Sequence, residues 1–301
     1  MNRPLERVAG APITWGVCEV DGWGFQLPSE RVLREMASIG LAATELGPEG
    51  YLPTDPSRLR DLLATHELTL VGGFVPARLH RSDGLAGELA RASKSSDLLS
   101  AAGGDVLVLV AAFGHGGYER SADLEADEWT TLVRGIDRII EIAAERGLTV
   151  GLHPHHGTLI QSPNQIHRVL ESSSVALCID TGHVLIGGGD PAEIARDVAD
   201  RVSHVHLKDV DADLAEQVRH ERLKYHEAVR LGLYRPLGEG DIDVAGIVRF
   251  LERSGYRGWY VLEQDIVLET GPEDGASPIR DAAASLEWLR RTLTNETSVS
   301  T

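Results

Sequence analysis

The feature that most constrains how this chain can fold is the regular alternation of short strand-like runs with longer helix-like runs. Eight short apolar segments have the composition and length of β-strands: 13–18, 42–46, 68–74, 106–112, 148–153, 175–180, 202–207 and 259–263. Amphipathic segments follow them in turn: 30–39, 56–66, 85–101, 125–146, 163–171, 191–200, 243–253 and 278–292. Strands that alternate with helices are typical of βα units and of a parallel sheet.

Eight strands followed by eight helices predict a closed (β/α)8 TIM barrel of the α/β class. An open, doubly wound sheet has a similar local pattern, but the first strand–helix segment carries no G-x-G-x-x-G motif, which disfavours the dinucleotide-binding form. A barrel of this kind accommodates all 301 residues, so we expect a single domain over 1–301.

Turn and cap residues mark where the predicted helices begin and end. Four pairs have an N-cap acceptor followed by a proline whose missing N–H is not needed: Asp55-Pro56, Ser162-Pro163, Asp190-Pro191 and Ser277-Pro278. Ser162 and Gln165 also fit a capping box. Three glycines stand where a left-handed residue is expected after a helix: Gly40, Gly147 and Gly255.

The longest departure from regular spacing is the insertion 208–242, which follows the seventh predicted strand. It contains a predicted helix over 211–231 and then the run PLGEGDID. Long loops at the carboxyl ends of barrel strands commonly cover the active site, so we expect this role for the insertion. It is also a plausible contact between subunits of a homodimer or homotetramer.

Charge and cysteine content exclude several classes of protein. The formal net charge is −17, from 46 acidic and 29 basic residues, so the overall field would repel a nucleic acid. No apolar run approaches the roughly 18 residues of a membrane span, and 1–16 lacks the apolar core of a secretory signal, so we expect a cytoplasmic protein. Cys18 and Cys178 have no metal-site spacing and are expected as reduced thiols.

Ionisable side chains gather at the carboxyl ends of the predicted strands, where barrel enzymes carry their functional groups. The residues concerned are Glu45, His153, His155, Asp180, His183, His204, His206, Lys208 and Glu263. Strand alternation places His153 and His155 on one face, and likewise His204, His206 and Lys208. Inward polar residues reduce core packing, which favours a functional role over ion pairs that merely fill a polar barrel mouth.

Four of these residues form a candidate metal site. His153, Asp180, His206 and Glu263 would come from four consecutive strands and converge on one point. Imidazole and carboxylate ligands together suit Mn²⁺ or Co²⁺, with Fe²⁺, Zn²⁺ or Mg²⁺ as further candidates, better than Ca²⁺. The absence of a cysteine ligand disfavours a structural zinc site.

Several motifs resemble those of a known superfamily. DTGH (180–183), HVHLKD (204–209), PLGEGDID (236–243) and VLEQD (261–265) resemble the xylose isomerase-like superfamily of sugar isomerases and epimerases. The resemblance extends from the first predicted strand to the last. Within it, ITWGVCEVDGWG (13–24), ATELGPEGYLP (43–53) and HPHHGT (153–158) are similar to the inosose dehydratases, which remove water from 2-keto-myo-inositol.

The resemblance implies a reaction and also shows a departure from the superfamily pattern. Its isomerases and epimerases typically have a glutamate at the end of strand five, where this chain has His153. The change removes one of two carboxylates used for proton transfer and therefore favours dehydration. It leaves open whether His153 or His155 is the metal ligand.

The resemblance also implies roles for individual residues. Glu263 would be a ligand and candidate base, His155 or His153 the proton donor, and Lys208 and His183 contacts to substrate oxygens. Further candidate contacts to a small polyol or keto-sugar are Glu45, Trp15, Trp23, His204 and Glu239. For Glu45 a structural cap on the next loop is an equal alternative. For the two tryptophans core packing is slightly favoured over a contact to the substrate. For Glu239 the alternative is a role in fixing its own loop.

Other functions remain as alternatives at this stage. A sugar isomerase or epimerase, or a lyase acting on 3-keto sugars or glycosides, would use the same metal site. A metal-dependent phosphodiesterase of the endonuclease IV type is disfavoured by the negative charge. A non-catalytic sugar-binding protein is disfavoured because all four strand ends keep a side chain that can bind a metal.

Overall fold

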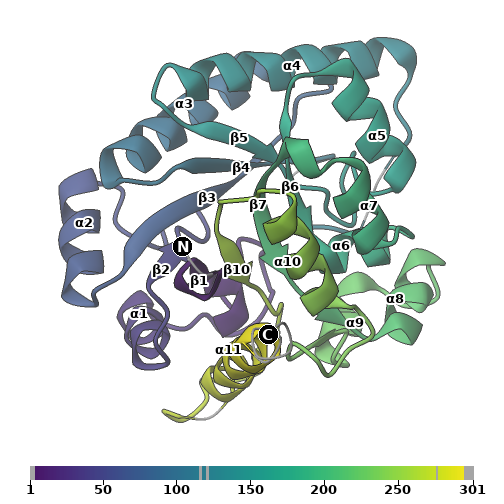
Figure 1. The fold of residues 1–301 in the computed structure, drawn as a ribbon. Helices are drawn as coiled ribbons and strands as arrows, with labels where there is room; N and C mark the ends of the chain where they lie inside the picture. Colours follow the sequence, from purple (N-terminus) through teal and green to yellow (C-terminus); the bar gives the residue numbers. More distant parts are fainter. Residues whose placement is uncertain (1–3, 115–116, 120–121, 276, 295–301) are drawn as a thin grey trace.

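Eight parallel strands close into a barrel in the computed structural model, which describes residues 4–114, 117–119, 122–275 and 277–294 (Figure 1). The strands of the barrel are β1 (Val8–Gly10), β2 (Ala43–Glu45), β3 (Thr69–Ala77), β4 (Val106–Ala111), β5 (Thr149–Leu152), β6 (Ala176–Asp180), β7 (Val202–Leu207) and β10 (Tyr260–Leu262). The ring closes because β1 pairs with both β2 and β10. The predicted TIM barrel is confirmed.

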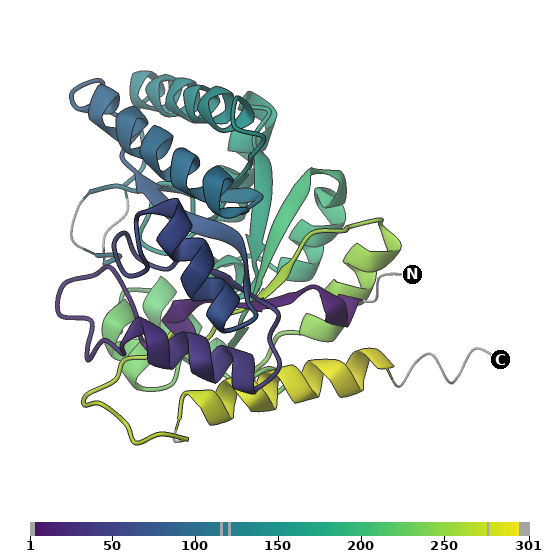
Figure 2. The same ribbon diagram turned by 90° about the vertical axis from the view of Figure 1, so that its left-hand side faces the viewer.

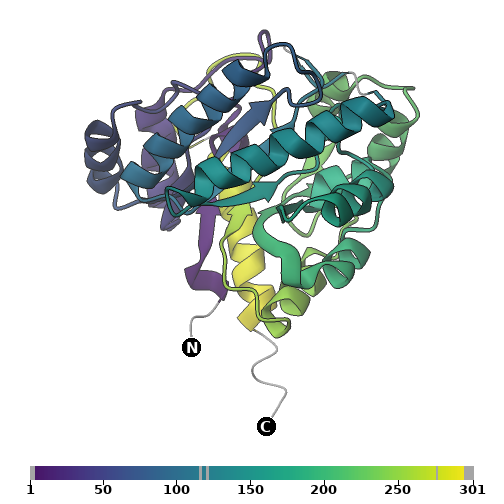
Figure 3. The same ribbon diagram turned by 90° about the horizontal axis from the view of Figure 1, so that it is seen from above.

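Helices surround the barrel and pack their apolar faces against it. They are α1 (Ser29–Ser38), α2 (Pro56–Thr65), α3 (Leu85–Ala102), α4 (Ala126–Ala144), α5 (Pro163–Ser172), α6 (Thr181–Ile186), α7 (Pro191–Asp197), α10 (Val244–Arg253) and α11 (Ile279–Thr294). On α10, for example, Val244, Ile247, Val248 and Leu251 are buried, which is the spacing of one helix face. Figure 3 shows α3 and α4 side by side on the outside of the barrel.

The first strand differs from the prediction. The expected strand 13–18 is wrong: β1 is Val8–Gly10, and Pro12–Trp15 forms a short 3-10 helix that ends at Gly16 with φ 76°. Proline cannot donate to a strand ladder, and the left-handed glycine turns the chain. The segment is apolar because Trp15 is fully buried, not because it pairs with neighbouring strands.

Most of the predicted helix ends are confirmed. Asp55, Ser162 and Asp190 each accept a hydrogen bond from a backbone N–H of the first helical turn, and Ser162 and Gln165 form the capping box. Ser277 is different, because its hydroxyl donates to the carboxylate of Asp281 (2.7 Å) and α11 begins only at Ile279. The three predicted C-terminal glycines have positive φ: Gly40 (86°), Gly147 (74°) and Gly255 (94°).

The insertion after β7 contains two helices where one was predicted. α8 (Ala212–Arg219) and α9 (Tyr225–Arg230) are separated by Glu221, whose φ of 55° ends the first helix. Two short antiparallel strands, β8 (Asp209–Val210) and β9 (Tyr234–Arg235), hold the base of the insertion together. The Asp209 carboxylate accepts three backbone N–H groups of the following PLGEGDID segment.

The two ends of the barrel have different roles. Figure 2 shows the start of β1 and the end of α11 at one end, while the loop after β1, the segment after β10 and the insertion lie toward the other. The carboxyl ends of the strands therefore open into the end that carries these long segments. Among the described helices, none has the length and apolar character needed to cross a bilayer.

Candidate metal and substrate site

The carboxyl ends of β5, β6, β7 and β10 bring the four expected metal ligands together. His153, Asp180, His206 and Glu263 each offer a ligand atom, and these atoms all lie within 4.8 Å of one another. All four side chains are buried. His153 Nε2 is 3.2 Å from Asp180 Oδ2, and His206 Nδ1 is 3.2 Å from Glu263 Oε2.

This cluster fits a divalent cation. His206 Nδ1 is buried without a hydrogen-bond partner and lies 3.2 Å from Glu263 Oε2 and 3.8 Å from Asp180 Oδ2. Burial alone lowers the pKa of His206, but Cys178, Glu263 and other neighbouring groups raise it well above its usual value. An imidazole nitrogen in this position needs a positive charge beside it, either a proton or a metal ion.

Lys208 lies beside the same carboxylates. Its Nζ is 3.1 Å from Glu263 Oε2, 3.3 Å from Asp180 Oδ2 and 2.7 Å from Asp265 Oδ1. Although burial lowers the pKa of Lys208, these three carboxylates raise it well above its usual value, so the amine is charged. Burial also tends to raise the pKa of Glu263, whereas His206 and Lys208 lower it to about 2.

His155 and His183 form the other side of the cluster. Their rings are 3.7 Å apart between centroids. His155 Nδ1 donates to the carbonyl oxygen of His156 (2.7 Å), so its Nε2 is an acceptor when the ring is neutral. Burial, together with His153 and Lys208, lowers the pKa of His155 well below its usual value. His183 accepts a hydrogen bond from Lys208 Nζ (3.2 Å).

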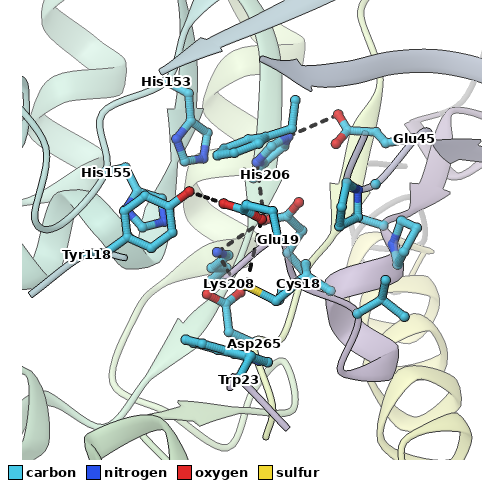
Figure 4. Close-up of a pocket in the computed structure, with 18 of the residues that line it drawn as sticks. Cys18, Glu19, Trp23, Glu45, Tyr118, His153, His155, His206, Lys208 and Asp265 are labelled. Carbon is cyan, nitrogen blue, oxygen red and sulfur yellow. Dashed lines mark hydrogen bonds and ion pairs between the residues drawn. The ribbon is translucent and has the colours of Figure 1, made fainter. Parts of the chain in front are cut away.

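A cavity opens onto most of these groups, as Figure 4 shows. Asp180 and His183 lie behind its wall, so the predicted contact of His183 to substrate is not supported by its position. Seven of the residues that the sequence predicted for the site line this cavity: Trp23, Glu45, His153, His155, His206, Lys208 and Glu263. Its other walls are Ala11, Pro12, Ile13, Val17, Cys18, Glu19, Gly47, Pro48, Phe74, Tyr118, Tyr225 and Asp265. The cavity therefore joins a charged floor to an aromatic and apolar wall.

Some residues predicted to contact substrate lie elsewhere. Trp15 is fully buried in the core, where its Nε1 donates to Glu35 (2.8 Å), and it does not line the cavity. Glu239 is exposed on the loop after β9, and its backbone N–H donates to Pro236. The structure thus supports core packing for Trp15 and a position away from the cavity for Glu239.

Glu45 and His204 face one another inside the barrel. Glu45 lines the cavity, and its Oε1 accepts hydrogen bonds from His204 Nε2 (2.7 Å) and His206 Nε2 (3.1 Å). His204 is fully buried and is not part of the cavity wall. These hydrogen bonds are not the cap expected as an alternative for Glu45, and because Glu45 lines the cavity its contact to substrate stays a prediction.

Sequence reasoning missed several residues of the cavity. Asp265 stands two residues after Glu263 in the VLEQD motif, and its place there was a signal that could have identified it. Glu19 lies in the segment after the misassigned first strand, and Tyr225 lies in the insertion, where no strand pattern fixes a direction. Burial raises the pKa of Asp265 to about 6, although Lys208 opposes this.

Both cysteines are free thiols, as expected. Cys178 lies on β6 close to His153 and His206, and its thiol could in principle join them at a metal ion. Burial raises its pKa to about 11, although His206 lowers it, so the sulfur keeps its proton at neutral pH. The carboxylates are the better ligands in this cluster.

Comparisons with known proteins show the family of the chain. A family model described as xylose isomerase-like TIM barrel matches residues 33–292. Inosose dehydratase of Geobacillus kaustophilus (strain HTA426) is 33% identical over 270 residues, which are 86% of this chain and 87% of that protein. Rhizopine catabolism protein MocC of Rhizobium meliloti is 32% identical over 86% of this chain and 81% of its own length.

Solved structures share the fold at lower sequence identity. A structure of L-ribulose 3-epimerase superposes with a TM-score of 0.71 at 18% identity and covers 98% of both chains. The probable 3-DHS dehydratase AsbF of Bacillus anthracis has a TM-score of 0.70 at 16% identity, over 94% of this chain and 98% of that chain. At these identities the likeness concerns the fold alone.

Proposed function

Because the chain belongs to the xylose isomerase-like TIM barrel family, we propose that it is a metal-dependent dehydratase acting on 2-keto-myo-inositol. The observation that carries this proposal is that β5 directs two imidazoles, and no carboxylate, into a cavity with a metal-binding cluster. The dehydratases among its relatives support the same reaction. The chain is an enzyme, and a cavity with a charged floor and an aromatic and apolar wall suits a sugar-like ketone, which has hydroxyl groups at its edges and an apolar CH face.

We assign the metal position to His153, Asp180, His206 and Glu263, with Mn²⁺ or Co²⁺ as the first candidates. When bound there, a divalent ion would stabilise negative charge that develops on the substrate's carbonyl oxygen. Glu263 suits the role of ligand better than that of base, because its Oε2 already faces His206 Nδ1 (3.2 Å) and the charged Lys208 Nζ (3.1 Å) within the cluster.

His155 is the better candidate for proton transfer. Its ring is neutral and its Nε2 is an acceptor, so it can take the proton from the carbon next to the carbonyl. The protonated ring can then return that proton to the hydroxyl that leaves from the adjacent carbon. One C–H bond and one C–O bond break, a C=C bond forms, and water is released. His155 thus acts first as base and then as acid.

Other side chains of the cavity would orient the substrate. The charged Lys208 can donate to a substrate oxygen while Asp180, Glu263 and Asp265 hold the amine in place. Glu19 and Asp265 supply acceptors for hydroxyl groups. Trp23 can lie against the CH face of a ring, because its Nε1 is held by the carbonyl oxygen of Ile266 (2.8 Å).

We further infer a role in inositol catabolism in the cytoplasm, with a small polyol-derived ketone as the partner. The names of the inosose dehydratases and of the rhizopine catabolism protein support this role. The net charge of −17 argues against a nucleic-acid substrate. A homodimer or homotetramer remains our expectation for the assembly.

The first experiment is to incubate metal-stripped protein with 2-keto-myo-inositol, with and without Mn²⁺ or Co²⁺, and to follow the products by NMR. We expect metal-dependent formation of trihydroxycyclohexane-dione. If the protein binds metal but forms no dione, the dehydratase proposal is wrong, and ketoses and 3-keto glycosides become the substrates to screen. An epimerase would give a stereoisomer of its substrate without loss of water.

A further inference from the structure

We propose that Glu45 is a positioning residue that fixes the orientation and the tautomer of His206 toward the metal position. His204 is the third member of this arrangement. The inference rests on the metal site proposed above, and it assigns to strand β2 a function in a cluster whose ligands all come from other strands. It replaces a direct contact to substrate as the main role of Glu45.

The contact crosses the interior of the barrel. β2 and β7 are not neighbours, because β1 and β10 lie between them in the ring. Glu45 Oε1 nevertheless lies 2.7 Å from His204 Nε2 and 3.1 Å from His206 Nε2. The three side chains are at most 3% exposed, so water does not compete for these hydrogen bonds. Figure 4 shows His206 between Glu45 and the groups around Lys208.

The chemistry of the three groups sets the tautomer. An ionised carboxylate has only acceptor sites, so both histidines must donate their Nε2–H to Glu45. A neutral His206 then has its lone pair on Nδ1, the atom that faces Glu263 and Asp180. Metal-binding histidines commonly depend on such a carboxylate at the other ring nitrogen, which orients the ring and increases its basicity.

His204 has a position that this arrangement explains. Its Nδ1 is buried without a hydrogen-bond partner, and its Nε2 is bound to Glu45. A fully buried imidazole with one unsatisfied nitrogen is unfavourable in a barrel interior unless its other contact has a use. By donating to Glu45, His204 fixes the carboxylate so that it cannot turn away from His206.

The test measures metal binding without any substrate, so that it is independent of the dehydratase activity. Co²⁺ affinity is determined by competition with a chelator, and the visible spectrum of bound Co²⁺ reports its ligand geometry. We expect Glu45→Ala to lower Co²⁺ affinity by about 10- to 100-fold and to change the spectrum. Glu45→Gln keeps an acceptor oxygen in place and should restore most of the affinity.

Glu287→Gln is the matched control, since it makes the same chemical change on an exposed face of α11 and should bind Co²⁺ like the wild type. Melting curves of the metal-free variants separate folding from metal binding. If Glu45→Ala does not fold, His204→Ala takes its place, with a smaller expected loss of affinity and the same change in spectrum.

Three results would overturn the proposal. Wild-type affinity and spectrum in a folded Glu45→Ala or His204→Ala variant would show that Glu45 does not position the ligand. A raised KM with unchanged Co²⁺ binding would make Glu45 a substrate contact. A wild-type protein that does not bind Co²⁺ or Mn²⁺ would refute the metal site itself, and this inference with it.

Discussion

His155 lines the cavity beside the four candidate metal ligands without being one of them, and in its proposed role it would exchange protons with the substrate. His155 Nδ1 donates to the carbonyl oxygen of His156. Neither ring nitrogen of His155 belongs to the cluster of four candidate ligand atoms. Its ring also lies against Tyr118, with centroids 4.0 Å apart, which restricts its rotation. A fixed, neutral imidazole is suited to general base catalysis.

We expect His155→Gln to lower kcat by about 10²- to 10⁴-fold, the usual contribution of a general acid–base group, with metal affinity unchanged. Steady-state kinetics and Co²⁺ titration measure the two quantities. His156→Gln is the matched control, because its side chain does not line the cavity, and its kcat at pH 7.5 should be close to that of the wild type. Loss of Co²⁺ binding in His155→Gln would instead identify His155 as a ligand.

Among the helices, α5 shows how a local sequence signal supports the site. It follows the loop that carries His155 and His156, and it begins with a reciprocal pair of hydrogen bonds between Ser162 and Gln165. A hydrogen bond joins the loop to the residue just before this helix start, because the backbone N–H of Gly157 donates to the side chain of Gln161. The start of this helix therefore fixes one end of the loop that carries His155 and His156.

Ser162→Ala should lower the free energy of unfolding by about 1 kcal/mol, since the N-cap acceptor is lost. Urea unfolding followed by circular dichroism measures this change. Ser172→Ala, in the last turn of the same helix, serves as control because its hydroxyl binds only a carbonyl oxygen of its own helix. It should alter stability by less than about 0.5 kcal/mol. Equal effects of the two substitutions would contradict the role of the cap.

The elements that could be predicted are those whose pattern is local. The run Val106–Ala111 is buried throughout, and its continuous apolar composition alone predicts a central strand. β1 has only three small residues, too short for any periodicity, so the more apolar segment after it was chosen instead. The helices α8 and α9 share a continuous polar and apolar pattern, and the turn over 220–224, in which Glu221 has a positive φ, separates them.

The same distinction applies to the site. His153, Asp180, His206 and Glu263 could be found because they end strands, and parallel strands of a barrel end on one side. Glu19 and Tyr225 lie on long connections, whose course depends on tertiary contacts that no local pattern encodes. The partnership of Glu45 with His206 was also out of reach, since it needs the register of strands that are not neighbours.

For the molecule as a whole, buried histidines make the fold sensitive to acid. Burial lowers the pKa of His156 to about 4, although Glu119 opposes this. In the unfolded chain a histidine has a pKa of about 6.5. As the pH falls from about 6.5 toward 4, the unfolded chain takes up a proton that the folded protein does not, so the free energy of unfolding decreases. Above this window His156 contributes no pH dependence.

His156→Gln should therefore make stability less dependent on pH between about 7 and 4.5. Urea unfolding at both pH values, on metal-free protein, measures the difference for the variant and for the wild type. His220→Gln is the matched control, because His220 is half-exposed on the surface near Glu216. If wild type and His156→Gln lose the same stability on acidification, His156 is not responsible.

The shortness of β1 has a consequence for how the closed ring of strands can open. β1 is joined to β10 by three residue pairs and to β2 by two, whereas β3 and β4 share six. β5 and β6 also share two pairs, but β1 is the strand that is short on both of its sides. Local opening begins where few contacts hold the chain. The chain that follows β1 carries Glu19 and Trp23, so separation of the strands at β1 would widen the entrance to the cavity.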